Sequence, residues 1–277
     1  MKKAQYRKWY FRQLRSYEKV SRGIVKKHLK NSLIKFAKDK PTEDNMVELL
    51  TKSVSYKTIF NMLLEIYIQV GGPFGNQVFK GINDNTLTVK RRFMSLWIES
   101  FAKNVLEFLG LYGGDNINSI RETFIDTVVE YIADRNDEGK SVQVITNEMV
   151  EKFGTKEGLY RYQIERIVRT ETGAAANYAS WVAMDDADLV VDKMWLSADD
   201  DRVRDGESKK EYNHRIMDGV TVPYNTLFKV PNQDGITNNV MYPMDMERGA
   251  AGNVINCRCI TAPVPRRDKN GRLVLKK

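Results

Sequence analysis

The sequence predicts an α+β fold in which a long helical region is followed by a small, loop-rich β domain. Up to about residue 185, apolar residues recur at helical spacing in runs that glycine, proline and capping residues separate. After Asp188, short apolar runs alternate with Asn, Asp and Gly turns, and prolines stand at positions 223, 231, 243, 263 and 265. We expect four segments: a basic amphipathic helical arm (1–40), a helical domain (41–185), a β domain (186–265) and a basic tail (266–277).

The first expected helix spans residues 3–38. This stretch contains no proline and a single glycine, Gly23, and its apolar residues recur every three to five positions. An unbroken helix of this length would extend about 50 Å at 1.5 Å per residue. Its polar face is basic, because residues 1–40 hold 14 Lys and Arg residues against only Glu18 and Asp39.

The net charge of +8 is unevenly distributed along the chain. Residues 1–40 carry a net +12 and residues 266–277 a net +5, so the middle of the chain carries a net −9. The positive charge of residues 1–40 favours a surface that binds DNA without sequence preference, or one that binds an acidic protein. A solvated face of a bundle helix is the alternative interpretation. The residues expected to contact DNA or a partner are Lys2, Lys3, Arg7, Lys8, Arg12, Arg15, Arg22, Lys26, Lys27 and Lys30.

The remaining helical region restarts at Pro41-Thr42-Glu43-Asp44, which is typical of a first helical turn. We expect the run Gly71-Gly72-Pro73 to end the next long helix and Gly113-Gly114 to end the one after it. Ser119 is the expected cap of the following helix. These helices span about residues 53–70, 89–111, 120–136, 142–153 and 156–185.

In the β domain, residues 189–191 and 193–196 read as strands. The glycines of this domain form no phosphate-binding loop, since neither GxxxxGK[ST] nor GxGxxG occurs between a strand and a helix. No run approaches the roughly 18 apolar residues of a membrane span, and the chain starts without an apolar signal region. We therefore expect synthesis in the cytoplasm and no membrane partner.

The two cysteines, Cys257 and Cys259, stand two residues apart, and one of the two histidines, His214, lies in the same domain. We expect free thiols in a reducing compartment, because a strand places both side chains on one face at the limit of disulfide reach. The three side chains are expected to meet in space. They could bind zinc with Asp200 or Asp245 as a fourth ligand, or the cysteines could be small buried side chains in a final strand.

Several short motifs occur in a fixed order, and together they resemble the Mu F-like head-morphogenesis family, the minor capsid proteins of tailed bacteriophages. The resemblance covers roughly residues 120–263. One departure is that residues 205–213 separate the Asp-Arg-x-Arg motif from the histidine. The motifs are Arg169-Thr170-Glu171, Trp195, Asp200-Asp201-Arg202-Val203-Arg204, His214-Arg215-Ile216-Met217-Asp218-Gly219, Tyr242-Pro243-Met244-Asp245 and Val254-Ile255-Asn256-Cys257-Arg258-Cys259.

The resemblance implies a non-catalytic virion protein that is present in few copies inside the head. Its implied partners are the portal protein, capsid or scaffold proteins and packaged DNA. Its implied role is in head assembly or in the fate of DNA at ejection, with residues 186–265 forming the Mu F-like β domain. The basic ends of the chain are consistent with this role.

Two further interpretations concern charged residues. We expect Arg169, Glu171 and Arg202, with Asp200, to form an ion-pair network between a long helix and the β domain. Alternatively, Glu171 is a catalytic carboxylate or a metal ligand.

The rival function of the chain is a metal-dependent hydrolase or transferase that acts on nucleic acid or nucleotides. It would use His214, Glu171 and a cysteine-bound metal. A DNA-binding or scaffold-type adaptor with an inert β domain is a third reading.

Overall fold

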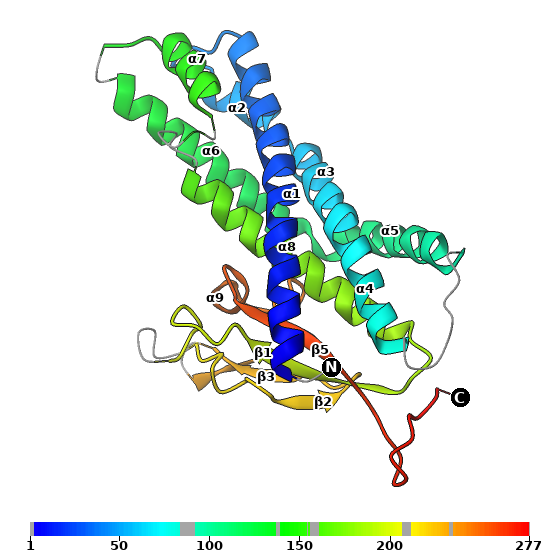
Figure 1. Cartoon of the computed structure of the whole chain (residues 1–277). Coiled ribbons are helices and arrows are strands. Elements are labelled where there is room, and N and C mark those ends of the chain that lie inside the picture. The colour runs from blue at the N-terminus through cyan, green and yellow to red at the C-terminus, as the bar shows by residue number, and fades with distance from the viewer. Residues whose placement is uncertain are drawn as a thin grey trace.

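The computed structural model describes residues 3–83, 92–136, 139–153, 155, 161–206, 212–232 and 235–276. It has the expected α+β architecture, with long helices standing on a small domain of antiparallel strands (Figure 1). The described helices are α1 (Lys3–Lys38), α2 (Met46–Ser53), α3 (Tyr56–Ile66), the π-helix η1 (Tyr67–Gly71), α4 (Gly72–Asn83), α5 (Arg92–Tyr112), α6 (Gly114–Asn136), α7 (Val142–Lys152), α8 (Arg161–Asp185) and the short α9 (Ala251–Val254). None of them is both long enough and apolar enough to cross a bilayer.

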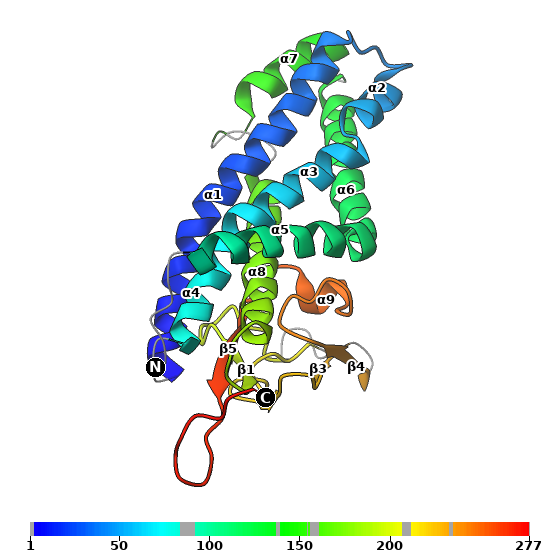
Figure 2. The same cartoon turned by 90° about the vertical axis from the view of Figure 1, so that its right-hand side faces the viewer.

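Helix α1 has the predicted bounds, but it is not a separate arm. It packs along α8, α3 and α7 (Figure 2). It buries an apolar stripe that includes Leu29, Leu33 and Phe36. Its first turns reach the β domain, where the Tyr6 hydroxyl donates to the carbonyl oxygen of Thr261 over 3.3 Å. The basic block therefore lies on the outer face of a central bundle helix.

The helical path from α3 to α4 is continuous, so the expected stop at Gly71-Gly72-Pro73 is wrong. The π-helical turn η1 directly precedes Pro73. Proline lacks an N–H group and its ring crowds the carbonyl one turn earlier, and a widened π turn relieves this conflict. Gly71 is needed for packing, because a Cβ atom there would lie 2.7 Å from the ring of Phe101 on α5.

Helix α5 ends at Tyr112, close to the expected end, and α6 begins directly after Gly113. The expected start of α6 at residue 120 is therefore too late, and Ser119 lies inside the helix. Gly113 fits this tight corner because a Cβ atom there would come 2.6 Å from the carbonyl oxygen of Leu109. The expected start of α5 at residue 89 lies outside the described residues.

The β domain has a three-stranded antiparallel sheet with the order β2-β1-β5 and a separate β3-β4 ribbon. In the central strand β1, Trp195 stands opposite Thr261 of β5, and Ser197 stands opposite Cys259. Helix α8 lies against β5. The described strands are β1 (Val191–Ser197), β2 (Thr221–Pro223), β3 (Phe228–Pro231), β4 (Thr237–Val240) and β5 (Cys259–Pro265).

The basic carboxy-terminal segment forms a loop that extends away from the β domain (Figure 1), and the two sides of this loop pair with the chain between α8 and β1. The backbone N–H of Val190 donates to Val274 over 2.8 Å, and the N–H of Arg266 donates to Val190 over 2.8 Å. The Lys276 ammonium donates to the Asp185 carbonyl at the carboxy-terminal end of α8, where a cation stabilises exposed carbonyl groups. Part of the positive charge at this end is thus used within the fold.

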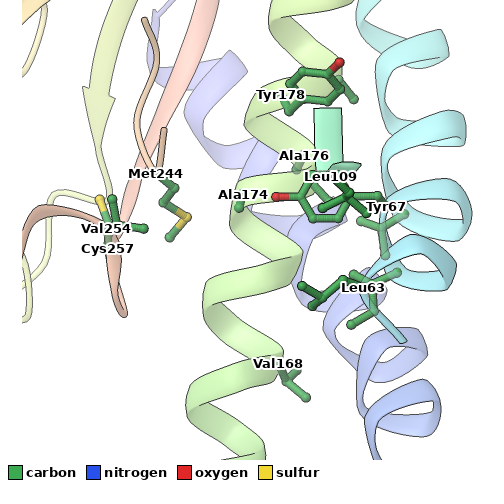
Figure 3. Packing of buried hydrophobic residues seen from close by; sticks show 14 of the residues in the cluster. Leu63, Tyr67, Leu109, Val168, Ala174, Ala176, Tyr178, Met244, Val254 and Cys257 are labelled. Carbon is green, nitrogen blue, oxygen red and sulfur yellow. The ribbon is translucent and has the colours of Figure 1, made fainter. Parts of the chain in front are cut away.

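Small residues let helix α8 lie between the bundle and the β domain. Ala174 and Ala176 are buried on α8, with Tyr67 and Leu109 of the bundle on one side of this helix and Met244 and Cys257 on its β-domain side (Figure 3). Gly173 on α8 leaves room for the Met244 side chain. The alanine-rich stretch of the sequence therefore marks the contact between the two regions.

Candidate functional site

His214, Cys257 and Cys259 form a compact cluster inside the β domain. The Nδ1 atom of His214 lies 3.4 Å from the Cys257 Sγ and 3.5 Å from the Cys259 Sγ. The three ligand atoms all lie within 4.8 Å of one another, and the side chains are 1–2% exposed. Both thiols are free. The structure therefore brings together the three residues that the sequence singled out.

The backbone around Asn256 sets the cysteine geometry. Asn256 adopts a left-handed conformation with φ of 55°, which Asn tolerates better than most residues, and it turns the chain from α9 into β5. Its N–H donates to the Thr170 hydroxyl over 3.0 Å, which ties the turn to α8. Only Cys259 lies in the strand, whereas Cys257 precedes it, so the expectation that one strand carries both thiols is corrected.

The inserted residues 205–213 do not separate the two motifs in space. Asp205 and Asn213 form an antiparallel bridge, and the N–H of His214 donates to the carbonyl of Arg204 over 2.8 Å. Arg204 and His214 are consequently neighbours, as they would be without the insertion. Residues 207–211 lie outside the described part of the chain.

A hydrogen-bond chain orients the imidazole. Asn253 donates from Nδ2 to the carbonyl oxygen of Pro231 over 3.1 Å, which identifies its Oδ1 as the atom that faces His214. The His214 Nε2 lies 2.8 Å from that oxygen and must carry a proton to donate to it. In the neutral ring the Nδ1 lone pair therefore points at the two sulfur atoms.

The two thiols differ in acidity because they share one buried site. Burial by itself raises the pKa of Cys257, but hydrogen bonding with Cys259 and His214 and the nearby charge of Arg204 lower it well below its ordinary value. Burial raises the pKa of Cys259, and the Cys257 thiolate raises it further, whereas the Trp195 indole N–H acts in the opposite direction. Cys257 therefore loses its proton more readily than Cys259.

Neither predicted fourth ligand belongs to this cluster. Asp200 pairs with the guanidinium of Arg258, and although partial burial raises its pKa, this pairing holds the pKa below its ordinary value overall. Asp245 is fully buried, and its carboxylate accepts the backbone N–H groups of Met241 over 2.8 Å and Glu247 over 3.1 Å. The Arg258 guanidinium therefore holds the Asp200 carboxylate, and backbone N–H groups hold the Asp245 carboxylate. The sequence pattern does not reveal these donors.

The expected network of Arg169, Glu171 and Arg202 is also absent as a unit. Arg169 donates to the Asn256 side chain over 3.3 Å, and Arg202 lies 3.7 Å from Asp200. Residues two apart on a helix point in different directions, so Glu171 turns away from Arg169 into the bundle. There it accepts from Asn116 over 3.3 Å, beside a cavity of about 80 Å³.

Sequence reasoning missed the polar residues that connect the segments. Asp218 accepts from Lys3, Arg7 and the Ser197 N–H, which joins the start of α1 to the sheet. Asn177 on α8 accepts from the Thr261 N–H over 2.8 Å and donates to the Cys259 carbonyl over 3.2 Å. A single Asn after three alanines was the available signal.

The predicted DNA-contacting residues differ in their exposure and in their ion pairs. Several are paired inside the chain, while Lys8, Arg12 and Arg15 are exposed and make no ion pair with any described residue. Lys26 and Lys30 are half-buried, and Lys2 lies outside the described residues. The internal ion pairs are Lys3–Asp218, Arg7–Asp218, Arg7–Asp199, Arg22–Glu165 and Lys27–Glu65.

Comparisons with protein-family models, with curated proteins and with solved structures find no match to this chain. The functional argument therefore depends on its own residues and their geometry.

Proposed function

We propose that the chain is a minor capsid protein of a tailed bacteriophage that acts in head morphogenesis, with a Mu F-like β domain. The observation that carries the proposal is that three of the motifs behind the resemblance are joined to one another where α8 meets the β domain. Thr170 and Arg169 bind Asn256, and the neighbouring Arg258 binds Asp200. Motifs that are far apart in the sequence thus serve one structural junction.

The same geometry favours a structural role over the rival hydrolase or transferase. A catalytic metal needs a coordination position that substrate can reach, whereas His214, Cys257 and Cys259 are almost completely buried. Glu171, the carboxylate that the rival mechanism requires, faces Asn116 on α6 and is not part of the cluster. The residues of that mechanism do not converge on one accessible site among the described residues.

Packaged DNA is the proposed partner of the outer face of α1. Lys8, Arg12, Arg15 and Lys19 are exposed and follow one another at spacings of four, three and four, so they lie on one side of the helix. We call these four residues the basic stripe. It extends about 16 Å along the helix axis, enough to follow roughly five phosphates of one DNA strand. A row of exposed positive charges contacts phosphate groups and does not read the bases, so we expect DNA binding without sequence preference.

The DNA contact is tested by replacing all four stripe residues with Gln. Binding of the purified chain to a random-sequence duplex is measured over a series of salt concentrations. We expect weaker binding and a salt slope smaller by about three to four, because fewer counterions are released. The matched control replaces four other exposed lysines, Lys35, Lys38, Lys40 and Lys52, and should change the slope by less than about one.

If both variants lost the same DNA affinity, the basic stripe would contribute only through the net charge of the chain and would not be a specific contact surface. Unchanged binding in the stripe variant would contradict the DNA assignment and make an acidic protein surface the partner of α1.

The head assignment is tested with virions of the phage that encodes the chain. We expect the chain to be present in few copies in purified particles and to resist added protease until the heads are opened. We also expect it to co-purify with the portal protein when the two are produced together. Absence from the particles, or digestion in intact heads, would contradict a location inside the head.

A further inference from the structure

We propose that His214, Cys257 and Cys259 bind one zinc ion, which fastens the loop that carries His214 to the start of β5. The inference rests on the geometry of the cluster and is independent of the phage assignment. His214 and Cys257 are 43 residues apart, so the ion would close a long loop in a domain with few and short strands. A clip of this kind restricts the unfolded chain and stabilises the fold.

The distances match zinc coordination. In a tetrahedral site with Zn–S near 2.3 Å and Zn–N near 2.1 Å, the nitrogen and sulfur atoms are about 3.6 Å apart. The observed separations from the His214 Nδ1 are 3.4 Å and 3.5 Å. Both nitrogen–sulfur separations are thus compatible with a shared zinc ion, and the three ligand atoms all lie within 4.8 Å of one another.

The imidazole is already set for metal binding. Its Nε2 is held by Asn253, and Asn253 is fixed by Pro231 and by the Asn238 side chain, 2.8 Å away. Metal-binding histidines commonly donate their other ring N–H to such a partner, which sets the tautomer and the ring orientation. The Asn253 contact leaves Nδ1, the atom nearest both sulfurs, as the free ligand.

Charge and ligand type select the metal. Two thiolates and a neutral imidazole balance the two positive charges of zinc, which suits a site that is 1–2% exposed. Sulfur and imidazole ligands disfavour magnesium and calcium, which prefer oxygen. Neither Asp200 nor Asp245 belongs to the cluster, so the described part of the chain supplies three ligands.

The first experiment measures metal in protein purified without chelators. We expect about one zinc per chain by elemental analysis, and X-ray absorption with two sulfur atoms at about 2.3 Å and one nitrogen at about 2.1 Å. The double variant Cys257→Ser, Cys259→Ser should contain less than a tenth of this zinc. The matched control His28→Gln, in which the other histidine is replaced, should retain all of it.

A variant that keeps all three ligands guards against loss of folding. Asn253→Ala should bind zinc about 10- to 100-fold more weakly in competition with a chromogenic chelator, because His214 loses the partner of its Nε2 while all three ligands stay in place. The four-residue stripe variant should keep one zinc per chain, so failure of DNA binding and failure of the metal site are distinguishable.

Three outcomes would overturn the proposal. They are absence of metal both as purified and after added zinc, a different metal at one equivalent, and an absorption spectrum without sulfur ligands.

Discussion

The helical bundle and the β domain bury polar groups in different ways. In the bundle, several buried hydroxyls bond within their own helix: Ser32 donates to His28, Thr146 to Val142 and Ser180 to Ala176, each four residues earlier. Thr172 of α8 is an exception, because its hydroxyl donates to Ser21 of α1 over 2.6 Å. In the β domain the partners are far apart in the sequence. The fully buried Lys193 donates to the carbonyl of Met241 over 2.7 Å, and His214 meets Asn253 and the cysteines.

The difference shows where each region gains its stability. The bundle spreads its stability over many aliphatic and aromatic contacts, so no single polar residue determines its fold. The β domain has short strands and depends on a few long-range polar contacts, each of which leaves a buried group unpaired when it is broken. We therefore expect substitutions of polar residues to have larger effects in the β domain and at its contact with α8.

The largest expected effect comes from the apolar core of the bundle. Phe36→Ala removes a fully buried ring of α1 and should lower the free energy of unfolding by about 3–5 kcal/mol. Urea unfolding followed by circular dichroism measures this change. Val20→Ala, at a 39% exposed position of the same helix, is the control and should change it by less than about 0.5 kcal/mol. Similar losses of unfolding free energy in Phe36→Ala and Val20→Ala would contradict the view that the apolar core stabilises the bundle.

The junction should be almost as sensitive to one polar residue. Asn177→Ala leaves the N–H of Thr261 and the carbonyl of Cys259 without their partner, which should cost about 2–4 kcal/mol. Asn31→Ala, at an exposed position of α1, should be nearly neutral. A loss below about 1 kcal/mol for Asn177→Ala would show that the contact between α8 and β5 is mainly apolar.

Glu171 gives a prediction with a defined pH dependence. Burial raises its pKa to about 7, against which a hydrogen bond from Asn116 acts only weakly. Because the folded state holds this proton more tightly than the unfolded state, the contribution of Glu171 to stability falls as pH rises from about 4.3 to 7. Glu171→Gln should therefore be up to about 3 kcal/mol more stable than the parent at pH 8, with a smaller gain at pH 5.

Thermal unfolding of both proteins across this pH range measures the difference. A gain that does not depend on pH would mean that the pKa of Glu171 is the same in the folded and the unfolded protein.

The smallest expected effect concerns an ion pair on the surface of the bundle. Arg22 binds both carboxylate oxygens of Glu165, over 2.6 Å and 2.7 Å, and both side chains are about one third exposed. Arg22→Ala should cost about 0.5–1 kcal/mol, and high salt should reduce this cost. Arg12→Ala, which removes an exposed arginine that has no ion pair among the described residues, should have no measurable effect. Equal losses would indicate a helix-propensity effect instead of an ion pair.

The sequence predicts the helices well where their pattern is long and local. The bounds of α1 follow from uninterrupted apolar periodicity, and the bounds of α7 agree within one residue. The run Gly71-Gly72-Pro73 misleads because tertiary packing overrides local helix breakers. A π turn accommodates Pro73, and Gly71 makes room for Phe101. Neither fact can be read from the spacing of residues.

The candidate site shows the same limit. Cys257, Cys259 and His214 could be predicted because such residues are rare in this chain and gather in one small domain. Asn253 could not, since asparagine is common in loops and its role depends on which atoms it faces. The prediction of Asp245 as a metal ligand is wrong because backbone N–H groups already bind its carboxylate, and a sequence does not show such contacts.

Amide hydrogen exchange before and after zinc removal tests the central contrast most directly. The account predicts that a zinc chelator speeds exchange in β1, β5 and residues 212–219, while the amides of α3 and α6 in the bundle keep their protection. The zinc content is measured on the same samples. Unchanged exchange in β5 after the zinc has been removed, or an equal increase throughout the bundle, would contradict a β domain held by its own buried ligands.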